Sequence, residues 1–85
     1  MKFIIKHEMK GRMRVRLSQK RMTYEQADIL QYYLLCNESV KLAKVYDRTC
    51  DAVINYTGDR EDVIRLLQEF HYQTVEVPAD VLATS

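Results

Sequence analysis

The sequence has only two cysteines, one proline and two glycines, and it has no long apolar run. Two cysteines are too few for a disulfide-stapled scaffold, so reduced thiols in the cytosol are expected. The longest uncharged apolar stretch lies within Ile29–Cys36, far short of the roughly 20 residues that a membrane-spanning helix needs. The charged N-terminal residues are unlike those of a signal peptide. These absences predict a soluble cytoplasmic protein, with no membrane insertion of this segment.

The residues that are present fit one small globular domain. The 85 residues are 47% hydrophobic and 29% charged, with a net charge of +1. A chain of this length buries about 60% of the surface that its unfolded form exposes, which is enough for a thin core. The small net charge gives no strong attraction to nucleic acid or acidic lipid. We expect one domain over residues 1–78, with residues 79–85 as a C-terminal tail or the start of a linker.

The N-terminal segment Lys2–Leu17 is expected to form a long first strand. From Arg12 to Leu17 charged and apolar residues alternate, which is the period of a strand with one buried face. Gly11 interrupts the segment, so a bend there and a hairpin at Lys10–Gly11 both remain open. The charged side of the alternation consists of Arg12, Arg14 and Arg16.

Two helices and three further strands are expected after this segment. Thr23 and Gln26 have capping-box spacing at the start of a helix over Tyr24–Cys36. Asp59 is placed to cap a second helix, whose apolar residues follow the i, i+3, i+4, i+7 pattern up to Phe70. Strands are predicted over residues 40–46, 52–56 and 72–77, the first two joined as an antiparallel hairpin. The order β, α, β, β, α, β predicts a ferredoxin-like α+β fold, with an antiparallel four-stranded sheet and two helices on one face.

From Val40 onward the sequence resembles heavy-metal-associated domains. The residues that carry the resemblance are Val40-x-x-Ala43-x-Val45, Thr49, Ala52-x-Ile54-x-Tyr56, Asp62-Val63-Ile64-x-x-Leu67 and His71-Tyr72. The N-terminal stretch His7-x-x-x-Gly11-Arg12-x-Arg14-Val15-Arg16 looks like a divergent branch of this family. That branch occurs at the cytosolic N-termini of metal-transporting P-type ATPases.

The metal-binding motif of the family is absent. Members typically carry Met-x-Cys-x-x-Cys between the first strand and the first helix, where two thiolates bind a soft ion. Here the loop reads Ser18-Gln19-Lys20-Arg21-Met22, which excludes metal delivery by that dithiol. The resemblance therefore implies a cytosolic regulatory or docking domain of a heavy-metal-translocating P-type ATPase, or a free-standing relative. Its implied partners are the cytosolic domains of such an ATPase, in cis or in trans.

A different metal site remains open at the same end of the sheet. The expected topology places Met22, Cys50 and His71 there, and such a cluster can bind Cu(I) or Zn(II). A small stand-alone metal-binding or chaperone-like protein using Cys50 and His71 is therefore the second function. The preferred interpretation gives these residues structural roles and no cofactor. A second candidate cluster, at the opposite end, comprises His7, Met9 and Cys36.

The arginine stripe is the candidate partner-binding surface. Arg12, Arg14 and Arg16 form a basic sheet surface that suits an acidic partner domain, phosphate groups or RNA. RNA-binding sheets of this topology stack bases on exposed aromatic side chains, and none interleaves these arginines. We expect the arginines to pair with acidic side chains on neighbouring strands or to dock the domain on a partner. A ligand- or nucleic-acid-binding module is the third function.

The sequence shows no catalytic constellation. It has no glycine-rich phosphate loop, no nucleophile–base pair and no paired carboxylates with any sign of a pocket. The domain itself is therefore not expected to be an enzyme, although it can be part of an ATPase.

Overall fold

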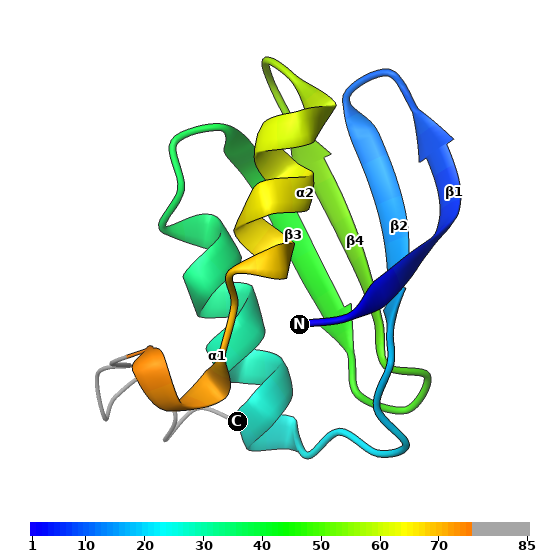
Figure 1. Cartoon of the computed structure of the whole chain (residues 1–85), viewed down its shortest axis with the longest axis vertical. Helices are drawn as coiled ribbons and strands as arrows, with labels where there is room; N and C mark the ends of the chain where they lie inside the picture. Colours follow the sequence, from blue (N-terminus) through cyan, green and yellow to red (C-terminus); the bar gives the residue numbers. More distant parts are fainter. Residues whose placement is uncertain (76–85) are drawn as a thin grey trace.

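The computed structural model describes residues 1–75, which form four strands, two α-helices and one 3-10 turn (Figure 1). The strands are β1 (Phe3–Met9), β2 (Arg12–Leu17), β3 (Val40–Tyr46) and β4 (Asp51–Tyr56). The helices are α1 (Tyr24–Leu35) and α2 (Arg60–Gln68), and the 3-10 turn η1 spans Tyr72–Thr74.

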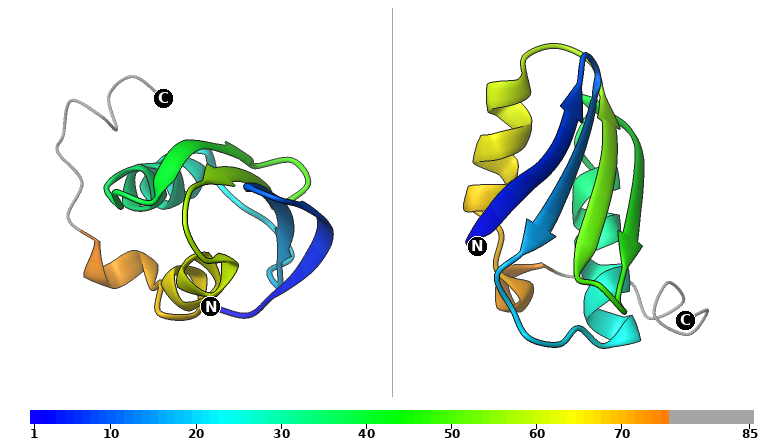
Figure 2. Two further views of the ribbon diagram at one scale, coloured as in Figure 1. Left: turned by 90° about the horizontal axis from the view of Figure 1, so that it is seen from above. Right: turned by 90° about the vertical axis from the view of Figure 1, so that its right-hand side faces the viewer.

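The strands form one antiparallel sheet in the order β1-β2-β4-β3. Both helices lie on the same side of this sheet, and no element within residues 1–75 covers the other side (Figures 1 and 2). The expected α+β class, with a four-stranded antiparallel sheet and two helices in a ferredoxin-like arrangement, is therefore confirmed. Within residues 1–75, one face of the sheet is therefore covered by the helices and the other is not.

The N-terminal segment is a hairpin and not one long strand. The chain reverses at Lys10–Gly11, so that Met9 pairs with Arg12. Gly11 has a φ of 79°, which glycine adopts without the steric cost of a side chain. The carbonyl oxygen of Gly11 also accepts a hydrogen bond from the backbone nitrogen of Tyr56 at 2.9 Å. The hairpin alternative is confirmed, and the single long first strand, interrupted near Gly11, is wrong.

The expected last strand does not form over its first residues, because Tyr72–Thr74 is the turn η1. The hairpin explains the difference, since β1 already occupies the sheet edge beside β2 where a last strand would pair. The ring of Tyr72 packs edge-on against Phe70, with 4.8 Å between centroids. Its hydroxyl donates to Oε1 of Gln19 at 2.7 Å. The end of that predicted strand and the predicted tail over residues 79–85 lie outside the described residues.

The core lies between the sheet and the two helices. Helix α1 contributes Ala27, Leu30 and Leu34, whose spacing places them on one side of the helix. The inward-facing residues of the strands complete the core, as expected for a sheet with one buried face. The largest fully buried apolar side chains are those of Phe70, Met13, Leu30, Leu34, Ile54, Leu67, Val15 and Val63.

Both edge strands are irregular. The register of β1 shifts between Ile5 and His7, and that of β3 shifts between Val40 and Leu42. On β3 the backbone nitrogen of Val45 donates to Oε1 of Gln31, a side chain of α1, at 3.2 Å. An outward-pointing backbone group of the edge is therefore already bonded within the molecule.

Helix α1 begins at the expected capping box. The Thr23 hydroxyl accepts from the backbone nitrogen of Gln26 at 3.0 Å, and Oε1 of Gln26 accepts from the backbone nitrogen of Thr23 at 3.1 Å. Both bonds satisfy backbone groups that the helix start leaves unpaired. Asp59 holds the corresponding position before α2, but its side chain makes no capping hydrogen bond.

We expect Thr23→Ala to lower the free energy of unfolding by about 1 kcal/mol, because the cap is lost while the core is unchanged. Urea denaturation followed by circular dichroism measures the change. The matched control is Thr57→Ala, an exposed threonine outside both helices, which should unfold close to the wild-type midpoint. Equal midpoints for the two variants would show that the capping box contributes nothing.

Candidate functional site

The candidate site is the sheet face opposite the helices, called the open face below. Cross-strand partners in an antiparallel sheet share a face, so the strand registers arrange its side chains in rows. The first row is Met9, Arg12, Asn55 and Leu42; the next is His7, Arg14, Val53 and Lys44; and the last is Ile4, Arg16, Asp51 and Tyr46.

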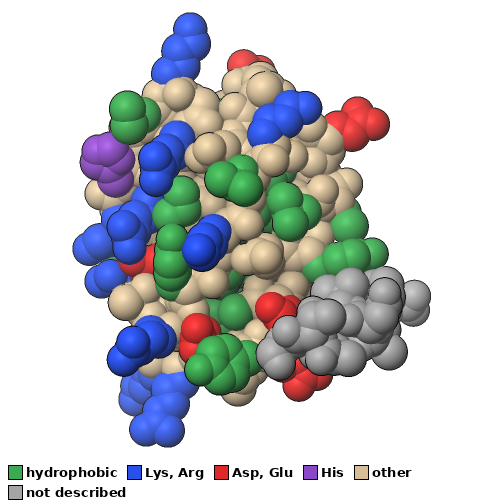
Figure 3. Space-filling model, turned by 180° about the vertical axis from the view of Figure 1, so that it is seen from behind, with side chains coloured by type: hydrophobic (Ala, Val, Ile, Leu, Met, Phe, Trp, Pro, Cys, Tyr) green, Lys and Arg blue, Asp and Glu red, His purple; other side chains and the backbone are tan. Residues whose placement is uncertain are grey.

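Positive charge gathers on the β1–β2 side of the open face, with apolar side chains among the charges (Figure 3). Arg12, Arg14 and Arg16 all lie on this face, because they alternate along β2 with core residues. Lys44 adds a further cation from β3. The open face is therefore basic. Among the residues of its three rows, Asp51 is the one that carries a carboxylate.

Asp51 is buried although its strand position faces outward, and its exposed fraction is 1%. Arg14 donates to Oδ2 from Nε at 3.2 Å and from Nη2 at 3.0 Å. Arg16 donates to Oδ1 from Nε at 2.8 Å. A desolvated carboxylate is costly unless it is paired, and these charge-assisted bonds offset that cost. The hydrogen bond from Arg16, and then that from Arg14, hold the pKa of Asp51 below its ordinary value.

The Asp51 network holds two guanidinium groups in place on the open face. The expected pairing with an acidic side chain on a neighbouring strand is therefore confirmed for Arg14 and Arg16. The guanidinium carbon of Arg14 also lies 6.0 Å from the centre of the Tyr46 ring, and Nζ of Lys44 lies 5.6 Å from it. Both cations are within the range of cation–π attraction. Arg12, by contrast, is exposed and forms no ion pair within residues 1–75.

Exposed apolar side chains share the open face with these charges. Ile4, Met9 and Leu42 are each more than half exposed, and Tyr46 is 40% exposed. Apolar groups that gather on one surface among polar ones mark an interaction site. Tyrosine, methionine and arginine are also the residue types enriched in protein interfaces. The open face therefore carries residue types that are common in protein interfaces.

A cavity of about 400 Å³ opens in this surface. It is lined by His7, Met9, Arg12, Arg14 and Val53. The lining combines two guanidinium groups and an imidazole with two apolar side chains, and it includes no carboxylate.

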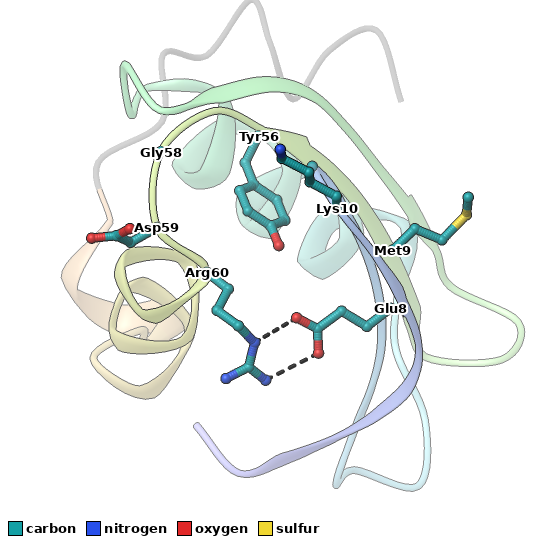
Figure 4. A pocket seen from close by; sticks show the side chains of 8 residues that line it. Glu8, Met9, Lys10, Tyr56, Gly58, Asp59 and Arg60 are labelled. Atoms are coloured by element: carbon teal, nitrogen blue, oxygen red, sulfur yellow. Dashed lines mark hydrogen bonds and ion pairs between the residues drawn. The ribbon is translucent and has the colours of Figure 1, made fainter.

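A second cavity, of about 440 Å³, lies beside the β1–β2 hairpin at the start of α2 (Figure 4). Arg60 and Glu8 point toward each other across it, and the Tyr56 ring is directed into it (Figure 4). Nη2 of Arg60 donates to Glu8 at 3.0 Å and Nη1 donates to Glu61 at 2.8 Å. The hydrogen bond from Arg60 holds the pKa of Glu8 below its ordinary value. The guanidinium is therefore paired with carboxylates of the chain itself, and the Arg60–Glu8 ion pair links the hairpin to α2.

The candidate metal ligands differ in how deeply their side chains are buried. Met22 and Cys50 are buried in the core, whereas His71 is exposed at the start of η1. The thiol of Cys50 lies 4.0 Å from the carbonyl oxygen of Asp47. Within residues 1–75 no group of three or more His, Cys, Asp and Glu side chains could hold a metal. Metal binding that also uses Met22 stays a prediction.

The second candidate cluster is not brought together by the fold. His7 and Met9 lie on the open face, as partners of β2 residues. Cys36 is the C-terminal cap of α1, in the helix layer on the other side of the sheet. These side chains therefore belong to different surfaces.

The sequence does not predict that Asp51 and His7 contribute to the open face. The strand predicted over residues 52–56 begins after Asp51, and the sequence offers His7 as a candidate metal ligand. A signal for Asp51 does exist, because it stands at outward spacing from Val53 and Asn55 in a strand expected to lie in the same sheet as the arginine stripe. The register that places it opposite Arg16 comes only from the structure.

Comparison of the chain with protein-family models, curated proteins and solved structures gives no match. The resemblance to heavy-metal-associated domains therefore rests on the sequence motifs alone. No helix in the described part of the chain has both the length and the apolar character to cross a membrane.

The Asp51 network should make stability depend on pH. A carboxylate whose pKa is lowered by folding stabilises the protein above its ordinary pKa of 3.8, and that stabilisation is lost as the pH falls through the folded-state value. We expect the free energy of unfolding of the wild type to fall over this acidic range, and Asp51→Asn to lose part of that dependence. Urea unfolding at a series of pH values measures both, and parallel profiles would contradict the assignment.

The two cysteines should differ in reactivity, because both are free thiols but only Cys36 is exposed. We expect a maleimide to label the folded chain at Cys36 and to reach Cys50 only in denaturant, as measured by mass spectrometry. The control is Cys36→Ser, which should react only after unfolding. Rapid labelling of folded Cys36→Ser would show that Cys50 is accessible to reagents, and therefore to metal ions.

Proposed function

We propose that this chain is a regulatory docking domain that binds an acidic protein surface through its open face. The observation that carries the proposal is the Asp51 network, which holds Arg14 and Arg16 on a sheet face that no described element covers. A buried ion pair adds little stability compared with apolar side chains of similar size. The ion pairs contribute more to binding, because arginines already held in place lose less side-chain entropy when a partner binds.

The side chains of the open face favour a protein partner over RNA. Sheets that bind RNA stack bases on aromatic side chains of their central strands. The central strands here are β2 and β4, and their outward residues are arginine, aspartate, valine and asparagine. The aromatic side chain of the face, Tyr46, lies on the edge strand β3. The exposed side chains of Ile4, Met9 and Leu42 suit the apolar part of a protein interface.

The partner that the sequence resemblance supports is the cytosolic part of a heavy-metal-translocating P-type ATPase, in cis or in trans. The loop over residues 18–22 has no cysteine pair, and Met22 is packed in the core. Docking is therefore a better role for this domain than transfer of a metal through that loop.

The size of the open face points to a weak and reversible complex. Its four strands lie about 4.8 Å apart, and about six residues per strand rise roughly 3.3 Å each, so the face measures roughly 20 by 20 Å. A stable complex buries about 800 Å² on each partner. A face of this size fits a contact at the low end of interface sizes, below about 1,200 Å² in total, as expected for a regulatory contact that forms and breaks with the state of the partner.

The proposal is tested by titrating isotope-labelled protein with the separate cytosolic domains of a heavy-metal-translocating P-type ATPase from the same organism. We expect NMR shift changes at open-face residues and not along α1 or α2, with a Kd in the micromolar range or weaker. Arg12→Glu should weaken binding about tenfold or more, because it places a carboxylate opposite an acidic partner.

The matched control is Lys20→Glu, which reverses an exposed cation in the loop between β2 and α1. This variant should bind like the wild type. Unchanged spectra with every cytosolic domain would refute the ATPase partner. Equal weakening by the two variants would mean that net charge, and not the open face, drives the association.

A further inference from the structure

The cavity in the open face has free cationic groups at its rim. Arg14 donates to Asp51 from Nε and Nη2, and its Nη1 forms no hydrogen bond within residues 1–75. Arg12 has no ion-pair partner in the same range. The carboxylate that Arg14 contacts, Asp51, also accepts from Arg16, so the three arginines outnumber it and the site is positive.

The strand register places the residues that line the cavity in two adjacent rows of the open face. His7 pairs with Arg14, and Arg14 pairs with Val53 on its other side. Arg12 and Met9 form the adjacent row on the same face. Neighbouring rows lie roughly 7 Å apart. Arg12 and Arg14 line the same cavity, so a carboxylate bound in it can contact both residues. Arginine is suited to this task because its planar group binds both oxygens of a carboxylate.

The apolar residues of the cavity lining favour an acidic side chain that carries methylene groups. Val53 is almost fully buried in the sheet beside Arg14, and Met9 is an exposed flexible side chain on β1. A carboxylate on a short hydrocarbon stem can therefore place its methylene groups against these two residues while its oxygens meet the arginines. Glutamate has this shape.

We infer that the cavity receives a glutamate side chain of the docking partner, an inference that rests on the proposed function. Asp51 is then a positioning residue, since it holds Arg14 in the orientation that presents Nη1 to the ligand. Arg12 and Arg14 bind the carboxylate directly. His7 closes the outer side of the cavity, on the edge strand.

The test uses two capped peptides, Gly-Ser-Glu-Ser-Gly and the same peptide with glutamine in place of glutamate. We expect the glutamate peptide to shift the NMR signals of His7, Arg14 and Val53, and the glutamine peptide to leave them unchanged. Arg12→Gln should weaken the glutamate peptide by about tenfold, the loss of one charge-assisted contact.

The matched variant is Lys44→Gln, which removes a cation of the open face outside the cavity lining. It should change the affinity less than about twofold. Both positions are exposed, and thermal unfolding confirms that each variant is folded.

The other outcomes show whether only the cavity site fails or the proposed function fails with it. Equal weakening by Arg12→Gln and Lys44→Gln overturns the cavity site and leaves docking by the whole face in place. The cavity site is also overturned, and docking by the whole face stays in place, if the ATPase domain binds but the peptide does not. Binding of a short oligouridine at these residues, tighter than that of the glutamate peptide, overturns the choice of a protein partner and the proposed function with it.

Discussion

The ionic contact between Asp51 and the two arginines of β2 is the interaction on which the sheet and its surface both depend. A slip of one residue between β2 and β4 would turn Asp51 toward the helices and the core side chains toward water. The buried carboxylate therefore requires the same register that the alternating Met13, Val15 and Leu17 require. Electrostatic pairing and apolar burial specify one arrangement, and the same pairing gives the open face its fixed arginines.

Much of the fold could be predicted because its signals are local. The capping box at Thr23, the stripe on α1 and the alternation along β2 and β3 each need only neighbouring residues. The choice between a hairpin and a continuous strand at Gly11 was not local, because it depends on whether β1 or a later segment fills the edge beside β2. The same competition decides the last strand, where Tyr72 packs on Phe70 and forms a turn.

The site could be predicted only in part, for a related reason. The alternation showed that the arginines share a face, but it could not show which side chains stand opposite them. Asp51, His7 and Val53 join the arginines through strand register, which is a contact between distant segments. The candidate metal ligands show a similar limit. Topology places Met22 and Cys50 at one end of the sheet, but it does not show that both are buried.

The protected edges of the sheet restrict how another chain can bind. Many sheets recruit a peptide by strand addition, in which the newcomer bonds to free backbone groups of an edge. Here β1 and β3 each carry a register irregularity, and Gln31 occupies the outward nitrogen of Val45. Such irregular and occupied edges discourage pairing between copies as well. The docking proposed here would then use side chains of the open face, where a change in one exposed residue can alter partner choice without disturbing the backbone.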